Sequence, residues 1–387
     1  MSIVTRDTFT GSNNIAKPER LPEGAVVDAL NMDFTVGGKA ELRTGFSKIR
    51  DGSNIRGLFT LGEHLVVVDG GSVFLRKDEV EHQVASVPLG PIAATECNGA
   101  LYLNTFTSSL VITPRDVHPW AVHEPTFDVA VVSGSMEPGL YKVGVTLTID
   151  GRESGCLPAV VRIGEGQAIS VRCASSGDLR LYCSVANGLT MYSQGRAHPV
   201  NIVSSPLDDT ARLETAFLTS LPFCERLISH DGLIIGSNGR FLYHTKPMHA
   251  HLHNAESDYL QFPAPITVIA SVEGGVYVCA DKTYFISNIG GQDMQQKTVT
   301  EFGAVPGTSV TLPDGKAAWF SEYGQVIAGP DGEAEFVNKG SYSPHITEGG
   351  ASGFLEHNGN QMIVTTMRGE QKGSCLKSVD HWDIEVI

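Results

Sequence analysis

The sequence has few aromatic residues and no paired cysteine motif, and both shortages limit what the protein can be. Aromatic residues make up 7% of the 387 residues. The cysteines number seven, are widely spread, and include no Cys-x-x-Cys pair, so neither a disulfide framework nor a zinc knuckle is indicated. We therefore expect reduced, mostly buried thiols at positions 97, 156, 173, 183, 224, 279 and 375.

Basic residues and long apolar runs are also scarce. The chain has 28 Lys and Arg against 43 Asp and Glu, a formal net charge of -15, whereas a protein that grips phosphate backbones needs a clustered basic excess. No run approaches the roughly 18 apolar residues of a membrane-spanning helix. Residues 1–7 lack the apolar core and cleavage site of a signal peptide. The sequence thus predicts a soluble, unsecreted protein that does not hold nucleic acid.

Short apolar runs, each preceded by a turn, recur along the chain and predict an all-β fold. The runs that carry this prediction are 65–68, 100–103, 233–236, 276–279, 317–320 and 361–364. Turn glycines at 232, 274, 315 and 359 are separated by 42, 41 and 44 residues, which is the length of one four-stranded propeller blade. The pattern therefore favours a β-propeller-like array of blades of about 40 residues. The alternative is a set of unrelated hairpins in several small β domains.

One interval breaks this rhythm and predicts an inserted domain. Gly99 and Gly232 are 133 residues apart, and the surplus over one period has the size of an immunoglobulin/fibronectin-like β-sandwich. Alternating apolar and polar residues at 139–149, 169–173 and 179–184 predict its strands. We expect an extended N-terminal segment at 1–50, propeller blades at 51–123 and 216–387, and the sandwich at 124–215.

A histidine cluster is the one candidate metal site. His249, His251 and His253 alternate along the chain, close to His244, and on a strand they would share one face in a geometry compatible with zinc or nickel. The segment lies where a connecting loop is expected, with Glu256 and Asp258 as the local carboxylates. The favoured interpretation is solvated loop histidines and no metal, with these three residues as weak candidates.

No catalytic motif stands out. The sequence has no sialidase box, no Gly-x-Ser-x-Gly elbow, no Walker loop and no His-Glu-x-x-His helix, and Gly164-x-Gly166 lacks the third glycine of a dinucleotide site. We therefore predict no enzyme activity, no catalytic residue and no cofactor. Acidic residues are too numerous to exclude a glycosidase pair by composition. A carbohydrate-binding or carbohydrate-cleaving propeller used for host recognition stays the alternative, weakened by the scattered aromatic residues.

The N-terminal residues resemble a known family. Gly11-x-Asn13-Asn14, Pro18-x-Arg20-Leu21-Pro22-x-Gly24, Asn31-x-Asp33 and Gly38-x-x-x-x-Arg43-x-Gly45 are similar to the opening of the tail nozzle or tail-tube-end proteins of short-tailed bacteriophages. Segments 151–155, 259–263 and 272–278 are similar to later parts of the same family.

This resemblance implies a structural virion protein without chemistry, made in the cytoplasm of the host bacterium. It implies a propeller with an inserted sandwich, a ring of six copies in the tail, contacts with adaptor, fibre or needle proteins, and double-stranded DNA that passes through the channel without specific binding. Acidic residues that could line the channel are Asp78, Glu79, Glu81, Glu333 and Glu335. We expect residues 1–45 to pack on a neighbouring subunit or to complete the last blade.

Overall fold

A computed structural model describes residues 8–29, 31–35, 37–43, 45, 47–342, 348–357, 359–368 and 383–386. The chain divides into two compact units. One contains Ile55–Gly236 and Tyr243–Leu260, and the other contains the described residues of Met1–Asn54, Ser237–Leu242 and Gln261–Ile387. No helix in the described part of the chain is long and apolar enough to cross a membrane.

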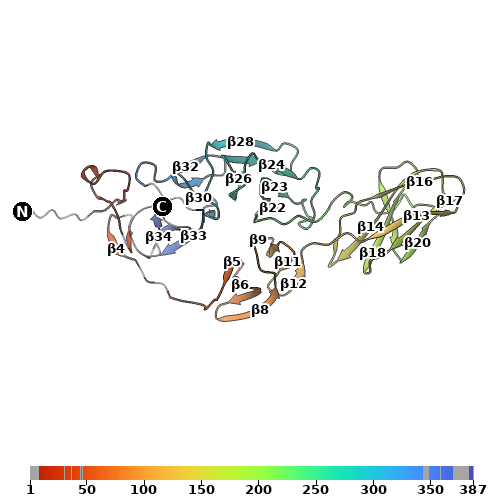
Figure 1. Ribbon diagram of the computed structural model, residues 1–387, viewed down its shortest axis with the longest axis horizontal. Helices are drawn as coiled ribbons and strands as arrows, with labels where there is room; N and C mark the ends of the chain where they lie inside the picture. The colour runs from red at the N-terminus through yellow and green to blue at the C-terminus, as the bar shows by residue number, and fades with distance from the viewer. Residues whose placement is uncertain are drawn as a thin grey trace, which may run out of the picture. The chain divides into compact units, whose positions relative to one another are not determined.

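The main architecture is a series of antiparallel sheets, each built from strands that follow one another in the sequence (Figure 1). The first two four-stranded sheets belong to the unit that starts at Ile55. Their strands are β5 (Ile55–Leu61), β6 (His64–Asp69), β7 (Ser72–Lys77) and β8 (Val80–Ser86), then β9 (Ile92–Cys97), β10 (Ala100–Thr105), β11 (Ser109–Ile112) and β12 (Val117–Pro119).

Three more four-stranded sheets follow, and a three-stranded sheet comes after them. The third sheet has β21 (Arg226–His230), β22 (Leu233–Asn238), β23 (Phe241–His244) and β24 (Tyr259–Gln261). The fourth and fifth have β25 (Val268–Val272), β26 (Gly275–Cys279), β27 (Thr283–Ser287), β28 (Gln295–Thr300), β29 (Val310–Thr311), β30 (Ala317–Ser321), β31 (Gly324–Ala328) and β32 (Ala334–Phe336). The last has β33 (Gly349–His357), β34 (Asn360–Arg368) and β35 (Asp383–Val386).

These sheets confirm the predicted propeller-like array. The six apolar runs of the sequence coincide with the second strand of each sheet, namely β6, β10, β22, β26, β30 and β34. Successive sheets share cores within each unit: Val66 of β6 packs in one cluster with Leu103 of β10, and Tyr277 of β26 in another with Trp319 of β30. Independent hairpins would not share cores in this way, so within each unit the sheets pack as consecutive blades.

The turn chemistry explains why these hairpins form. Asn98 and Gly99 both have positive φ, 52° and 76°, between β9 and β10. Asp231 and Gly232 repeat this with 48° and 76° between β21 and β22. Two consecutive positive φ angles match the right-handed twist of paired strands, and Asn-Gly and Asp-Gly reach them at the lowest cost.

The inserted domain is a two-sheet β-sandwich between the second and third blades. One sheet contains β13 (Phe127–Ser133), β17 (Gln167–Cys173) and β20 (Val200–Val203). The other contains β14 (Gly139–Ile149), β15 (Arg152–Glu153), β16 (Ala159–Ile163), β18 (Asp178–Ser184) and β19 (Met191–Arg196). Val143, Ile169 and Leu181 are buried in one core shared by both sheets, because alternate residues of each strand point inward.

The N-terminal segment is less extended than the sequence predicts. It contains a 3-10 helix (Pro18–Arg20), a parallel pair β1 (Gly11–Ser12) and β2 (Ala25–Val26), and an antiparallel pair β3 (Met32–Phe34) and β4 (Ala40–Leu42). In the described residues these strands pair with one another and not with the last sheet, which contains only β33, β34 and β35. The segment contacts its own unit where the Asn14 N–H donates to the Ser341 carbonyl at 3.1 Å.

Several residues that carry the family resemblance have structural roles in this segment. The Asn13 side-chain oxygen accepts the N–H groups of Ile15 and Ala16. The Arg43 guanidinium donates to Asp33 at 3.2 Å. Hydrogen bonds within the segment thus give Asn13, Asp33 and Arg43 a structural role.

Candidate binding site

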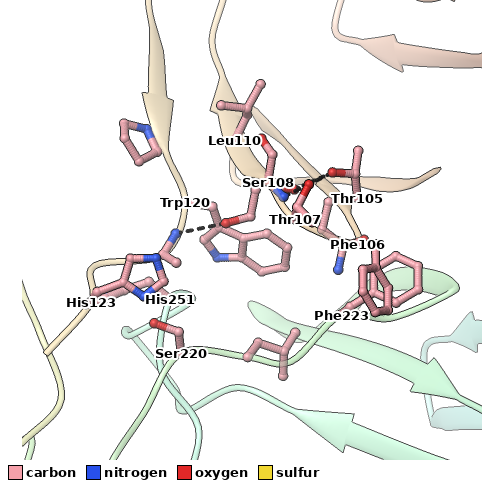
Figure 2. A pocket seen from close by; sticks show the side chains of 15 residues that line it. Thr105, Phe106, Thr107, Ser108, Leu110, Trp120, His123, Ser220, Phe223 and His251 are labelled. Carbon is pink, nitrogen blue, oxygen red and sulfur yellow. Dashed lines mark hydrogen bonds between the residues drawn. The ribbon is translucent and has the colours of Figure 1, made fainter. Parts of the chain in front are cut away.

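A pocket of about 430 Å³ lies within the unit that starts at Ile55. It is formed by the β10–β11 turn, the chain that leaves β12, the chain that approaches β21, and His251 (Figure 2). Its hydroxyl side chains are Thr105, Thr107, Ser108, Ser109 and Ser220, and its rings are Phe106, Trp120, His123, Phe223 and His251. No Asp, Glu, Lys or Arg is among the residues that line it.

The β10–β11 turn holds Phe106 at the edge of this pocket. The Thr105 hydroxyl donates to the Ser108 carbonyl at 3.0 Å and accepts the Ser108 N–H at 3.1 Å. These bonds close a tight loop whose tip is Phe106 and Thr107. The Phe106 side chain is consequently 77% exposed.

Asn104, at the end of β10, holds the segment that contains Cys224 against the β10–β11 turn. With its amide oriented to satisfy both groups, its nitrogen donates to the Cys224 carbonyl and its oxygen accepts the Cys224 N–H, each at 3.0 Å. Both residues are buried. The neighbouring Phe223 ring then meets Phe106 edge to face, with 5.6 Å between ring centroids, a favourable arrangement for an aromatic pair.

Trp120 forms the buried side of the pocket. Its indole N–H donates to the Ala250 carbonyl at 2.8 Å, and its ring packs against Tyr102 with 5.3 Å between centroids. Its carbonyl accepts the Arg152 guanidinium at 3.0 Å. Because Arg152 belongs to β15, this bond joins the pocket wall to the sandwich.

His251 is held in a defined neutral form. Its Nε2 lies 2.9 Å from the Glu153 carbonyl, and burial is the main cause that lowers the pKa of its imidazole below 6.5, assisted by the charges of Arg152 and His249 and opposed by the bond to Glu153. A ring nitrogen that faces a carbonyl oxygen must carry the proton. The neutral ring therefore has Nδ1 as a hydrogen-bond acceptor.

The histidine cluster differs from the sequence prediction. Residues 246–252 form tight turns, with the Lys246 N–H donating to the Leu252 carbonyl at 2.9 Å, so His249, His251 and His253 do not share one face of a strand. His251 and His253 are not solvated loop residues either: they are 6% and 3% exposed. Within the described residues, no group of three or more His, Cys, Asp or Glu side chains could hold a metal ion.

The reason lies in the partners of each ring. His249 bonds the Pro247 carbonyl, His251 the Glu153 carbonyl and His253 the Thr219 carbonyl. Ring nitrogens committed to carbonyl groups of three different segments do not converge on one ion. His251 and His253 instead join the segment between β23 and β24 to Glu153 of β15 and to Thr219, which precedes β21.

The cysteines agree with the sequence prediction. The six described cysteines are free and buried, and Cys375 lies outside the described residues. Burial raises the pKa of the Cys156, Cys183 and Cys224 thiols to about 12. Such thiols are unreactive at neutral pH because the thiolate is the reactive form.

The proposed channel acids are divided between the two units. Asp78, Glu79 and Glu81 lie on or beside the β7–β8 turn, and Glu333 and Glu335 lie at β32. Four of the five are exposed, and Glu81 is half-buried. None of them lines the pocket.

Comparison with known proteins gives distant structural likeness only. No family model matches the chain, and no curated protein matches it. Similar solved structures include BBS1N in complex with ARL6DN (TM-score 0.33, 12% identity, covering 84% of this chain and 92% of that one). Apo AztD from Citrobacter koseri has a TM-score of 0.28 and 16% identity over 70% and 82% of the two chains. The ancestral GH74 enzyme AFV00434 has a TM-score of 0.24 and 9% identity over 87% and 70%. This degree of likeness transfers neither a function nor a site residue.

Proposed function

We propose that the protein is a structural component of a bacteriophage tail that assembles as a ring, in the nozzle or at the head-to-tail or tail-tip position. The observation that carries the proposal is the N-terminal motif series, Gly11 to Gly45, followed by propeller blades with one inserted sandwich. Propeller blades are rigid, and an inserted sandwich adds contact surface without disturbing them. This combination suits a protein that serves as a mechanical part.

The chemistry of the pocket supports a role without catalysis. Glycoside hydrolysis needs two carboxyl groups beside the scissile bond, and the pocket residues include no carboxyl group. The buried thiols are unreactive for the reason given above. A carbohydrate-cleaving function therefore has no support at this pocket.

The sandwich offers surface for assembly. Within the described residues, β13 and β20 each pair on one side only, with β17. Val200 and Ile202 of β20 are 55% and 66% exposed, and this strand carries no charged side chain. Natural proteins usually protect such edges with charges or cover them with another element, so contact with another subunit would explain their composition.

Net charge fits the passage of DNA. At -15 per chain, a ring of several copies repels the duplex, whereas Lys–phosphate contacts would retain it through release of counterions. The functional ring would line a channel without holding the genome, with neighbouring tail proteins as its lasting partners.

Two measurements on the purified full chain test the proposal. Light scattering coupled to size exclusion should give a single oligomer, and negative-stain imaging should show a ring with a central channel, six-fold by the family resemblance. A chain that stays monomeric across the accessible concentration range would contradict the ring. A gel-shift titration at low salt should show no duplex binding, and tight binding would contradict the proposed channel lining.

A further inference from the structure

The strongest unassigned feature is the aromatic pair at the pocket. Phe106 and Phe223 are 117 residues apart in the sequence, yet their rings meet at 5.6 Å, and Phe106 stays 77% exposed. In the view of Figure 2 these two rings lie at one end of the pocket and the imidazoles of His123 and His251 at the other. An exposed ring on a rigid turn is a surface on which an apolar face can stack.

The polar side chains of the pocket are mainly hydroxyls and imidazoles. The hydroxyls of Thr107 and Ser108 and the imidazole of His123 have no hydrogen-bond partner among the described residues. Hydroxyl groups and a neutral imidazole both donate and accept hydrogen bonds. They match a ligand whose own groups are hydroxyls, because each such group also donates and accepts.

The absence of charge from the lining narrows the ligand class further. Phosphate or carboxylate ligands are usually recognised by Arg or Lys side chains, and none lines this pocket. A volume of about 430 Å³ is within the range of small-molecule sites. Apolar walls with a few polar groups are also the usual composition of such sites.

We propose that this pocket binds one or two units of a neutral carbohydrate, with the apolar face of one sugar ring stacked on Phe106, hydroxyls near that ring bonded to Thr107 and Ser108, and a hydroxyl at the far end of the carbohydrate bonded to His123. This goes beyond the proposed structural role, since it gives the ring protein a contact with a glycan surface. The scattered aromatic residues do not oppose it, because the fold brings Phe106, Trp120 and Phe223 into one pocket.

The test is saturation-transfer difference NMR on the full chain with a fixed panel of sugars. The panel contains the methyl glycosides of glucose, galactose, mannose and N-acetylglucosamine, the disaccharides lactose, maltose and chitobiose, and glucuronic acid as the charged counterpart. At least one neutral sugar should give a saturable signal with a millimolar Kd, strongest on the protons of one ring face. The same sugar should bind more tightly than glucuronic acid.

Three variants separate ring stacking from general apolar contact. Phe106→Ala should weaken binding roughly tenfold or more, Phe106→Leu should weaken it nearly as much, and Phe106→Trp should retain it, because only an aromatic face stacks on sugar C–H groups. Tyr323→Ala is the matched control, since Tyr323 is also an exposed aromatic residue, 56% exposed, packed edge to face on Phe302. It should bind like the unmodified chain.

Two results would overturn the proposal. One is the absence of a saturable signal for every neutral sugar in the panel. The other is binding whose affinity is unchanged in Phe106→Ala or in Phe106→Leu. Unchanged affinity in Phe106→Leu would indicate an apolar peptide or lipid group as the occupant. Both outcomes are read independently of the oligomeric state, so failure of the ring proposal leaves this test intact.

Discussion

Asn104→Ala should loosen the pocket wall by a measurable amount. Asn104 makes two hydrogen bonds to the backbone of Cys224, each 3.0 Å long, and Cys224 is fully buried. Leaving a buried backbone group without its partner costs about 1–3 kcal/mol, and two groups are affected here. Water that enters the space of the deleted amide offsets part of that penalty. We expect a net loss of about 2–4 kcal/mol of local stability.

Hydrogen exchange measured by mass spectrometry is the direct assay, because the Cys224 N–H is one of the two groups affected. A loss of about 2–4 kcal/mol corresponds to roughly 30- to 1,000-fold faster exchange in the peptide that contains Cys224. Thr107→Ala is the matched control on the same turn, since that hydroxyl has no partner in the described residues, and it should leave exchange unchanged. An acceleration of less than threefold in Asn104→Ala would refute the assigned role of this side chain.

Three further predictions concern the sandwich, the N-terminal segment and pH. Replacing residues 124–215 by a short Gly-Ser linker should leave a folded remainder whose β content per residue, measured by circular dichroism, is unchanged. Its thermal stability should be lower, because Trp120 and His251 lose their bonds to β15. An aggregated product would count against independent folding. Removing residues 1–24 should impair assembly more than solubility, and a truncated chain that assembles as well as the full one by light scattering would contradict this. Burial is the largest of the effects that lower the pKa of His251 and His253 below 6.5. The stability that these two neutral rings contribute is therefore complete above pH 6.5 and is lost as pH falls through their pKa values in the folded protein. Denaturant titrations from pH 7.5 to 5 should show the free energy of unfolding decline as pH falls. His251→Gln should make this dependence on pH less steep, and an unchanged dependence would show that His251 does not contribute.

Local patterns were sufficient to predict the blades but not the pocket. A blade is defined by strands adjacent in sequence and by turn dipeptides such as Asn98-Gly99, so apolar runs and glycine spacing reveal it directly. Phe106, Trp120, Phe223 and His251 lie on four separate segments, and only the topology brings them together. No short motif marks such a set.

The histidine misinterpretation has a similar cause. Alternation of His249, His251 and His253 is a strand signal only if the backbone is extended. Pro247 and Met248, the latter at φ 64°, precede a series of turns instead. The His251 and His253 rings are oriented by hydrogen bonds to carbonyl groups of distant segments, about which sequence spacing carries no information, whereas the His249 ring bonds the nearby Pro247 carbonyl.

The insertion point of the sandwich has a mechanical consequence. The chain leaves the second blade through residues 120–126 and returns through 204–223, and both passages line the same pocket. Arg152 on the Trp120 carbonyl and His251 on the Glu153 carbonyl also link the two parts across this neck. Rotation of the sandwich about the neck would stretch these two hydrogen bonds, so they resist that rotation. A force applied to the sandwich would therefore reach the blades through the Trp120 carbonyl and the His251 ring.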